Sequence, residues 1–327
     1  MGTCIACAAP ASKQCAKCPE YYCSRECQLA AWQEHKFTCS ANVEVRPVEG
    51  SGMGVFARRA FIPGDCLVRE KPLFVNSSAG WSMARSQEHA EALSDAQVTA
   101  QVPLLPDARR AAVMQLADVF SADSAEATPA GIARTNSIPV GDDGALFALS
   151  ARFNHSCLPS ARWCWRADLG CLLIFAMRPI AAGEQVTIAY SKTFAEREKR
   201  VRHLQAKFKF TCACPLCSGP ADPKADDRMI EIQALIDAMP EACKTDHARA
   251  LELSERTLQL LVDAGLDTPI TMGTCHYEAY QLARSTGKKA KAGEHLLRAF
   301  ELAKLSDGAD SPLALQYGAL VTRLASK

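Results

Sequence analysis

The stretch RFNHSC (residues 152–157) places Asn154, His155 and Cys157 within four positions of one another. Two interpretations are open on these residues alone. A thiol beside an imidazole could be a catalytic nucleophile with its base. Alternatively, Cys157 could be a metal ligand, with Asn154 and His155 belonging to a cofactor site. The distribution of the other cysteines bears on this choice.

Cysteine is abundant and unevenly distributed in this chain. Seven of its sixteen cysteines lie within the first 39 residues, and three more lie between positions 212 and 217. In a secreted chain such a count would suggest disulfides, whereas a reducing compartment favours metal ligation or catalysis. The clustering therefore predicts zinc sites.

The composition describes a soluble globular protein of about two domains. Of its 327 residues, 48% are hydrophobic and 22% are charged, and the formal net charge is +1. This near-neutral balance gives no overall electrostatic reason to bind nucleic acid or an anionic membrane. The first residues lack the apolar core of a signal peptide, and no apolar run approaches the roughly 20 residues of a membrane span. We therefore expect an intracellular protein with no membrane partner.

Eight potential metal ligands lie in the N-terminal segment CIACAAPASKQCAKCPEYYCSRECQLAAWQEHKFTC (residues 4–39). Their spacing is C-x2-C-x7-C-x2-C-x4-C-x3-C-x7-H-x3-C, and each C-x2-C pair can direct two thiolates at one ion. Ser24 is a suitable cap for a helix through QLAAWQEHK, on which ligands four residues apart share a face. Eight ligands make two closed sites, and so short a segment should fold only when they are filled.

This spacing resembles the MYND zinc finger, whose two ions are bound in interleaved fashion. The resemblance implies one zinc on Cys4, Cys7, Cys23 and Cys27, and a second on Cys15, Cys18, His35 and Cys39. It also implies a module that binds short proline-containing peptides, with a purely structural role as the alternative. Closed sites of this kind leave no coordination position for catalysis.

Short strands are predicted from about residue 43 to 75. VEVRPV, MGVFARRAF and CLVREKPLFV mix β-branched and aromatic residues between EGSG and IPGD turns. Gly52 and Gly54 flank Met53, which leaves the backbone free to pass close to a ligand. A lone G-x-G is more often a hairpin turn. Residues 78–130 look helical, including DARRAAVMQLADVF, and we expect an insertion here.

A second strand-rich segment runs from residue 135 to 190, with predicted strands SARWCWRA, GCLLIFAMRPI and EQVTIAY. An amphipathic helix is predicted for FAEREKRVRHLQAKF, and we interpret its EREKRVR run as a solvated face rather than a nucleic-acid patch. The helix leads into FKFTCACPLC, where Cys212, Cys214 and Cys217 offer three thiolates. Three ligands do not close a structural zinc site, and Cys157 can supply the fourth.

The ordered set G-x-G, N-S, N-H-S-C, G-E-x-V-T-I-x-Y and C-x-C-x2-C resembles the SET domain of protein lysine methyltransferases with its cysteine-rich post-SET segment. In that family the cysteine of N-H-S-C joins the post-SET cysteines on a zinc ion. The resemblance therefore implies a third zinc on Cys157, Cys212, Cys214 and Cys217. A cysteine protease or transferase would leave the other four elements unexplained.

The resemblance extends to the SET-and-MYND proteins, which add a helical C-terminal region. Residues 222–325 carry apolar residues at helical spacing throughout, and helix pairs with short turns suggest a tetratricopeptide-like (TPR-like) array. Such an array could bind partners or act as a lid that stabilises the catalytic domain. In the common layout the finger is inserted after the G-x-G strand, whereas here it comes first. We therefore expect the finger to lie differently relative to the substrate cleft.

The prediction is an α+β protein whose β-rich SET domain follows a double-zinc finger. Its predicted segments are a MYND finger (1–40), the N-terminal part of the SET domain (41–77), a helical insertion (78–132), the SET core (133–192), a post-SET segment with zinc (193–220) and a helical TPR-like C-terminal domain (221–327).

The resemblance also implies roles for individual residues. Tyr190 is expected to orient the methyl group and the attacking amine, and Ile138 and Phe208 to line the lysine channel. A tyrosine is frequent in the family where Phe208 stands, so we expect the phenylalanine to affect how many methyl groups are added. The amine must be neutral to attack, which an apolar channel favours. The residues expected to contact S-adenosylmethionine (SAM) are Gly52, Met53, Gly54, Asn136, Asn154, His155 and Phe210, which would stack on the adenine.

The predicted function is SAM-dependent methylation of lysine in a histone or another protein, with SAM and three zinc ions as cofactors. The alternative from another class is a catalytically idle adaptor that binds partners through its finger and helices. Retention of Asn154, His155 and Tyr190 argues against that alternative. We expect a monomer in the cytoplasm, the nucleus or both, without specific nucleic-acid binding.

Overall fold

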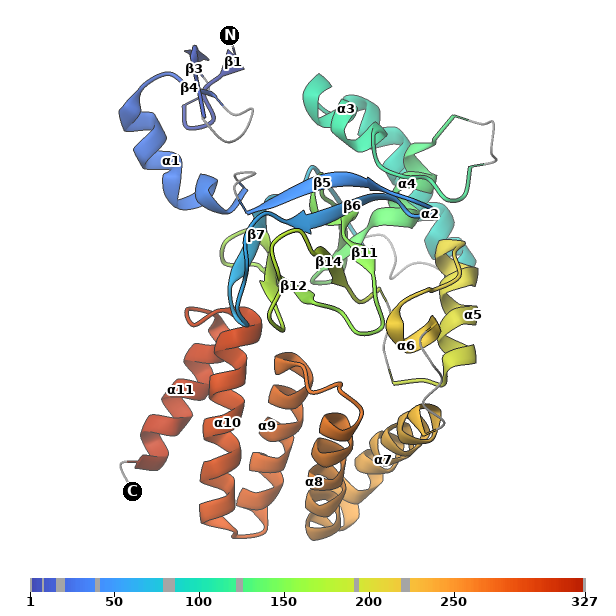
Figure 1. Cartoon of the computed structure of the whole chain (residues 1–327), viewed down its shortest axis with the longest axis vertical. Helices are drawn as coiled ribbons and strands as arrows, with labels where there is room; N and C mark the ends of the chain where they lie inside the picture. Colours follow the sequence, from blue (N-terminus) through green and yellow to red (C-terminus); the bar gives the residue numbers. More distant parts are fainter. Residues whose placement is uncertain are drawn as a thin grey trace.

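The computed structural model of the chain describes residues 2–7, 9–15, 21–38, 42–78, 86–121, 126–190, 194–218 and 224–325. A small N-terminal unit is followed by a region of short β-strands, and a run of helices forms the C-terminal part (Figure 1). The predicted α+β class is confirmed.

The N-terminal unit consists of two small hairpins and one helix. The helix begins at the expected residue, because Ser24 Oγ accepts a hydrogen bond of 3.2 Å from the backbone N–H of Cys27. The buried hydrophobic cluster of this unit contains four residues, two of them cysteines, which is little core for an independent fold. The elements are β1 (Gly2–Thr3), β2 (Pro10–Ala11), β3 (Lys13–Gln14), β4 (Tyr21–Tyr22) and α1 (Arg25–Thr38).

Three small sheets form the middle of the molecule, with strand orders β11-β14-β6-β5, β12-β13-β7 and β8-β10-β9. Neighbouring strands are antiparallel except β11 and β14, which run parallel. This parallel pair matters for the site because it joins two of the predicted motifs. The strands are β5 (Val43–Val48), β6 (Gly52–Ala57), β7 (Cys66–Glu70), β8 (Phe74–Asn76), β9 (Ile138–Val140), β10 (Asp143–Leu146), β11 (Asn154–His155), β12 (Ala161–Arg166), β13 (Cys171–Ala176) and β14 (Gln185–Ile188).

The central strand β13 is buried at every position. Its alternate residues face two different cores, as the strand geometry requires. Leu172 and Ile174 belong to the main hydrophobic cluster between the sheets, whereas Leu173 and Phe175 pack with Cys164 on the opposite face. A continuous apolar run therefore marks a strand that is covered on both sides.

Helices lie between β8 and β9, namely α2 (Gln87–Gln101), a 3-10 turn (Val102–Leu104), α3 (Asp107–Met114) and α4 (Pro129–Asn136). The helix expected for residues 107–120 ends at Met114, earlier than the sequence suggested. The carboxylate of Asp118 explains this, because it accepts hydrogen bonds from the backbone N–H groups of Phe120, Ser121 and Thr128. Such local bonds favour a turn over a continued helix.

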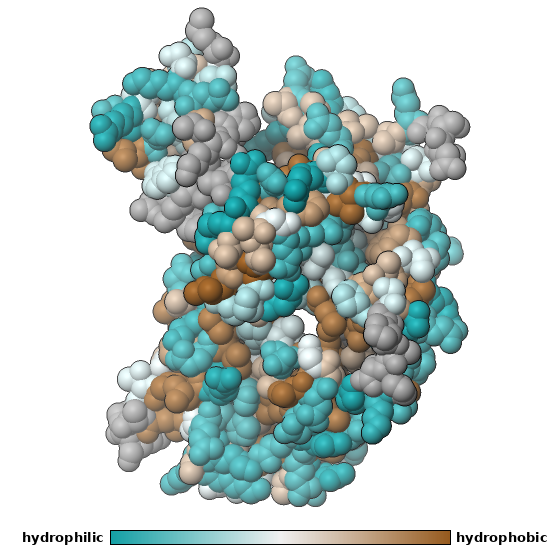
Figure 2. Space-filling view, in the orientation of Figure 1, coloured by the Kyte–Doolittle hydropathy of each residue, from teal (hydrophilic) through white to brown (hydrophobic). Residues whose placement is uncertain are grey.

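The C-terminal region is an array of helices joined by short connections (Figure 1). Asp246 caps α8 by accepting hydrogen bonds from the backbone N–H groups of Ala248 and Arg249. On the face shown in Figure 2, hydrophilic residues cover most of this region, and hydrophobic residues gather where it meets the sheets. The helices from the end of the sheets onward are α5 (Arg197–Phe208), α6 (Pro215–Ser218), α7 (Ala225–Thr245), α8 (His247–Asp263), α9 (Pro269–Ser285), α10 (Lys289–Asp307) and α11 (Pro312–Ala325).

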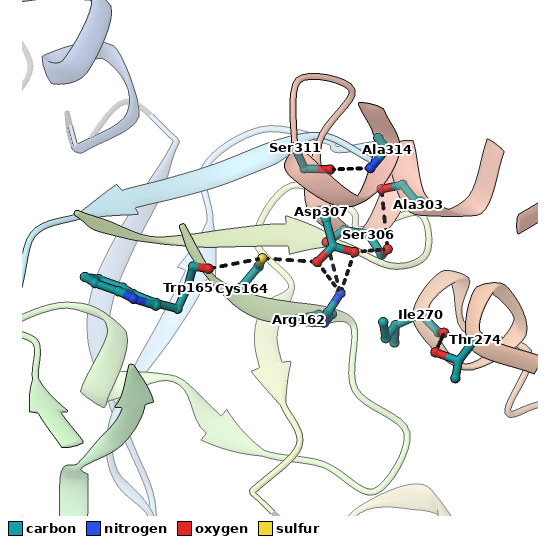
Figure 3. A network of polar contacts seen from close by, with 10 residues as sticks. All are labelled: Arg162, Cys164, Trp165, Ile270, Thr274, Ala303, Ser306, Asp307, Ser311 and Ala314. Carbon is teal, nitrogen blue, oxygen red and sulfur yellow. Dashed lines mark hydrogen bonds and ion pairs between the residues drawn. The ribbon is translucent and has the colours of Figure 1, made fainter. Parts of the chain in front are cut away.

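The end of α10 packs against the sheet that contains β12 and β13. Arg162 Nη1 donates to both carboxylate oxygens of Asp307, at 3.0 and 2.9 Å, and the Cys164 thiol donates to Oδ1 at 3.1 Å (Figure 3). Gly308 follows with φ of +96° and lies close to the Phe175 ring. This contact fixes the helical array to the sheet of β12 and β13. In the described part of the chain, no helix has the length and hydropathy needed to cross a bilayer.

Candidate functional site

Four cysteines of the N-terminal unit converge on one point. Cys4 follows β1, Cys7 lies in the next turn, Cys23 follows β4, and Cys27 is in the first turn of α1. All four sulfurs lie within 4.8 Å of one another, with 3.5 Å between Cys7 and Cys23 and 3.4 Å between Cys23 and Cys27. A tetrahedral zinc with Zn–S bonds of about 2.3 Å separates its sulfurs by about 3.8 Å. The group has the dimensions of such a site.

The second predicted group of the finger falls largely outside the described residues. Cys15 is buried after β3. Cys18 and Cys39 lie outside the described residues, and His35 lies on α1 with its side chain outside them. This ligand set stays a prediction.

A further group of four cysteines joins distant parts of the chain. Cys157 follows β11, whereas Cys212, Cys214 and Cys217 follow α5. Their sulfurs also lie within 4.8 Å of one another, and Cys157 Sγ is 3.6 Å from Cys217 Sγ. All four residues are buried. The structure thus brings Cys157 to the other three, as the opening motif suggested.

His155 connects this cysteine group to the end of β14. Its Nδ1 accepts the backbone N–H of Tyr190 at 3.0 Å, and its Nε2 lies 3.3 Å from Cys157 Sγ. Burial lowers the pKa of His155 to about 4, so the ring is neutral near pH 7. Since Nδ1 is an acceptor, the proton is on Nε2 and can be donated to the sulfur. His155 therefore contacts both Tyr190, just after β14, and the thiol of Cys157.

Aromatic side chains surround Tyr190. Its ring centroid lies 4.9 Å from that of Phe208 and 5.3 Å from that of His155, and the Phe210 ring meets it edge-on at 6.4 Å. The Tyr190 hydroxyl donates to the carbonyl oxygen of Phe153 at 2.6 Å. Burial raises the pKa of this phenol to about 12. Tyr190 is therefore a neutral phenol whose oxygen lone pairs remain able to accept.

Gly54 lies where three strands align. The pairings place Asn154 opposite Thr187 on β14, and β14 pairs next to β6, which contains Gly54. A Cβ on Gly54 would lie 2.6 Å from both Gln185 Nε2 and Val48 Cγ2 and 3.1 Å from Asn154 Nδ2, so a larger residue would have to displace these side chains. Neither amide nitrogen has a hydrogen-bond partner within the described structure. Buried donors without partners are rare, which fits a place where a bound molecule supplies acceptors.

The remaining predicted residues have varied environments. Gly52 has φ of +68°, and Met53 is 39% exposed beside it. Ile138 is buried in the main core, against which Tyr190 also packs. Asn136 ends α4, where its Nδ2 donates to the carbonyl oxygens of Ala117 and Ile132. No described contact joins Asn136 to the aromatic group, so its role stays a prediction.

Sequence reasoning did not select Gln185 or Arg200. Gln185 opens the V-T-I-x-Y strand, and its position two residues before Thr187 places it on the same face as Asn154. Arg200 was included in a run interpreted as a solvated face, but it is 3% exposed. Its spacing of four residues from the buried Leu204 was the signal for an inward position.

Comparison with known families supports the motif assignments. The SET domain model matches residues 52–191, and the MYND finger model matches residues 4–39. The two matches follow one another along the chain, with the finger first.

Several curated proteins are similar to this chain at modest identity. Histone-lysine N-methyltransferase ASHR1 of Arabidopsis thaliana is 25% identical over 64% of this chain and 45% of its own length. Histone-lysine N-methyltransferase SMYD3 of Mus musculus is 25% identical over 62% of this chain and 48% of its own length. Protein-lysine N-trimethyltransferase SMYD5 of Homo sapiens is 35% identical over 24% of this chain and 19% of its own length. The chain thus spans less than half of each of these relatives.

A solved structure of Rubisco LSMT bound to AdoMet aligns with 91% of this chain and 93% of its own, at 11% identity and a TM-score of 0.33. This similarity is too low to carry an argument.

Proposed function

Because the chain is a SET- and MYND-domain protein whose finger precedes its SET domain, we propose that it is a SAM-dependent protein-lysine N-methyltransferase. The observation that carries the proposal is the aromatic group around Tyr190, which adjoins both Asn154-His155 and the four-cysteine group. The relatives named as lysine methyltransferases support the same reaction class.

The cysteine groups are proposed as structural zinc sites. Four sulfur ligands close a tetrahedral site, so each zinc would stabilise the fold and leave no position for substrate. The proposed ligand sets are Cys4, Cys7, Cys23 and Cys27; Cys15, Cys18, His35 and Cys39; and Cys157, Cys212, Cys214 and Cys217.

The proposed SAM site consists of the glycine loop, the asparagines and the aromatic residues beside them. SAM would supply an activated methyl group, and the chain supplies its binding surface. Gly54 admits a close backbone approach, and the buried amides of Asn154 and Gln185 offer donors. The set proposed from the sequence is Gly52, Met53, Gly54, Asn136, Asn154, His155 and Phe210, and the unpartnered amide adds Gln185 to it.

Tyr190 is the proposed catalytic residue, with Ile138 and Phe208 lining the lysine channel. A lysine amine that enters between Tyr190 and Phe208 loses the hydration of its charge, which lowers its pKa and favours the attacking neutral form. The Tyr190 O–H is donated to the Phe153 carbonyl. Its oxygen can therefore accept an N–H of the amine and orient the nitrogen lone pair.

SAM binding by the full chain, loaded with zinc, tests this proposal. We expect saturable binding in isothermal titration calorimetry and about a tenfold loss of affinity in Asn154→Ala, from one lost hydrogen bond of about 1.4 kcal/mol. Asn42→Ala is the matched control, because Asn42 bonds to the Leu67 carbonyl on another strand. Labelled SAM with a cell extract then identifies methylated lysines.

Absence of SAM binding in a folded, zinc-loaded sample would contradict the enzymatic proposal. The adaptor function would then be preferred, with the finger and helices as the binding surfaces.

A further inference from the structure

A buried arginine lies beside the four-cysteine group of Cys157. Arg200 is 3% exposed, although the side chain of Arg202 on the same helix is 70% exposed. The Arg200 guanidinium donates to the carbonyl oxygens of Ala195 and Leu216, and its Nη2 lies 3.7 Å from Cys217 Sγ. A positive charge is thus enclosed between α5 and the cysteine loop.

The enclosed charge has too little compensation from carboxylates. Arginine keeps its proton in proteins, and a buried charge is unfavourable unless an opposite charge lies close. Among the described residues, its one ion-pair partner is Asp226, at 4.0 Å. The Asp226 side chain is 50% exposed and also accepts the backbone N–H of Arg197, so water screens much of its charge. The guanidinium needs another anion.

The cysteine group supplies that anion once it holds zinc. Four thiolates and one Zn²⁺ carry a net charge of −2, and the four cysteines are at most 8% exposed. His155 contacts the same group through its Nε2, which lies 3.3 Å from Cys157 Sγ. The buried dianion and the buried Arg200 cation can therefore compensate each other's charge.

We propose that Arg200 is the internal counter-ion of this zinc site and that its charge helps to retain the ion. The proposal rests on the zinc site proposed above and is independent of methyl transfer. Because Arg200 lies on α5, which ends at Phe208 and is followed by Phe210, it also ties zinc occupancy to the segment that carries these aromatic residues. Substitution of a residue that contacts metal ligands in this way typically lowers metal affinity by about 10–100-fold.

A purely mechanical role is the competing explanation. In that case Arg200 would only clamp α5 to the cysteine loop through the Ala195 and Leu216 carbonyls. Two substitutions separate the explanations. Arg200→Gln keeps N–H donors and removes the charge, whereas Arg200→Lys keeps the charge and loses the fork of donors. Arg202→Gln is the control, because Arg202 pairs with Glu198 on the exposed face of α5.

The experiment counts zinc ions on the full chain by native mass spectrometry across a chelator series. Released cysteines are then alkylated and mapped by peptide mass spectrometry, which separates this site from the finger. Folding is checked by circular dichroism. We expect Arg200→Gln to lose one zinc at 10- to 100-fold lower chelator concentration, with alkylation confined to residues 157 and 212–217. Arg200→Lys should retain zinc far better, and Arg202→Gln should match the wild type.

Unchanged zinc retention in Arg200→Gln would overturn the counter-ion role, as would equal losses in Arg200→Gln and Arg200→Lys. A wild-type chain without zinc at Cys157 would instead refute the site itself. SAM binding is measured on the same samples, so failure of the methyltransferase proposal would be seen separately.

Discussion

Phe208 packs against Tyr190 with 4.9 Å between ring centroids, so these two side chains set the width of the proposed lysine channel. A hydroxyl on the Phe208 ring would occupy space and offer a hydrogen bond to the amine. We expect Phe208→Tyr to shift the product toward fewer methyl groups per lysine, because a methylated amine is larger and has fewer N–H groups. Mass spectrometry of a substrate peptide after many turnovers measures this distribution.

Phe300→Tyr is the matched control for this change. It adds the same oxygen to a partly buried ring of α10, which packs in a separate cluster with Tyr317. A product distribution in Phe208→Tyr identical to that of the wild type would remove Phe208 from control of the methylation state.

At the residue level, the spacing of residues in the sequence predicted their chemical roles better than it predicted whether their side chains are buried. The C-x2-C and C-x-C-x2-C spacings indicate zinc binding directly, because few other functions require thiols at these separations. Arg200 was different, since its membership of a charged run indicated an exposed position, and only its spacing of four residues from Leu204 indicated a buried one. Only tertiary packing against the cysteine loop encloses it.

Two histidines meet between α9 and α10. His276 Nδ1 lies 2.9 Å from His295 Nδ1, and the other ring nitrogen of His295 lies 3.5 Å from Glu255, which Lys291 also pairs with. Burial lowers the pKa of His276 to about 4, and the charges of His295 and Arg298 act in the same direction. We therefore expect this pair to make the helical array sensitive to acid.

The sign of the effect follows from proton binding. In the unfolded chain His276 takes up a proton near pH 6.5, whereas in the folded chain it does so only near pH 4. The unfolded state therefore binds more protons between these values, and stability should fall as pH falls from about 6.5 to 4. We expect His276→Asn, whose amide can replace the Nδ1 hydrogen bond without titrating, to lose less stability over this window.

Thermal unfolding at several pH values measures the difference. His247→Asn is the control, because His247 is exposed at the start of α8. Parallel pH curves for His276→Asn and the wild type would show that the histidine pair does not contribute to acid sensitivity.

Among the elements, strands and long helices were predicted more reliably than the insertion. The strand segments show either alternating polar and apolar residues or a continuous apolar run, and strong turn signals bound them. The strands β5, β12 and β13 lie where the sequence indicated them. The helix α4, which begins at the end of the insertion, and the strands β9 and β10, which follow it, were not anticipated. Their form depends on contacts such as the cap at Thr128, whose hydroxyl accepts the backbone N–H of Gly131, and on Asp118.

At the scale of the whole molecule, the order of domains could be read from the motifs, but their packing could not. The finger, the SET motifs and the helical region follow each other in the sequence as the family matches do. The contact between Arg162 and Asp307 joins residues 145 positions apart. No local pattern marks either as a partner of the other, because both charges are ordinary at exposed positions.

That contact gives the last prediction. The side chains of Arg162 and Asp307 are 26% and 10% exposed, and the Asp307 carboxylate also accepts from Cys164 and Ser306 (Figure 3). Removing one partner of a buried ion pair leaves the other uncompensated, so we expect Asp307→Asn to lower the free energy of unfolding by about 3 kcal/mol. Urea denaturation measures the loss. Asp310→Asn is the control, since its side chain is 79% exposed and its buried partner Arg166 keeps an ion pair with Asp168, so this change should cost at most about 1 kcal/mol. Equal losses in the two variants would mean that the helical array is held to the sheet by its apolar contacts around Phe175 and Gly308 rather than by this ion pair.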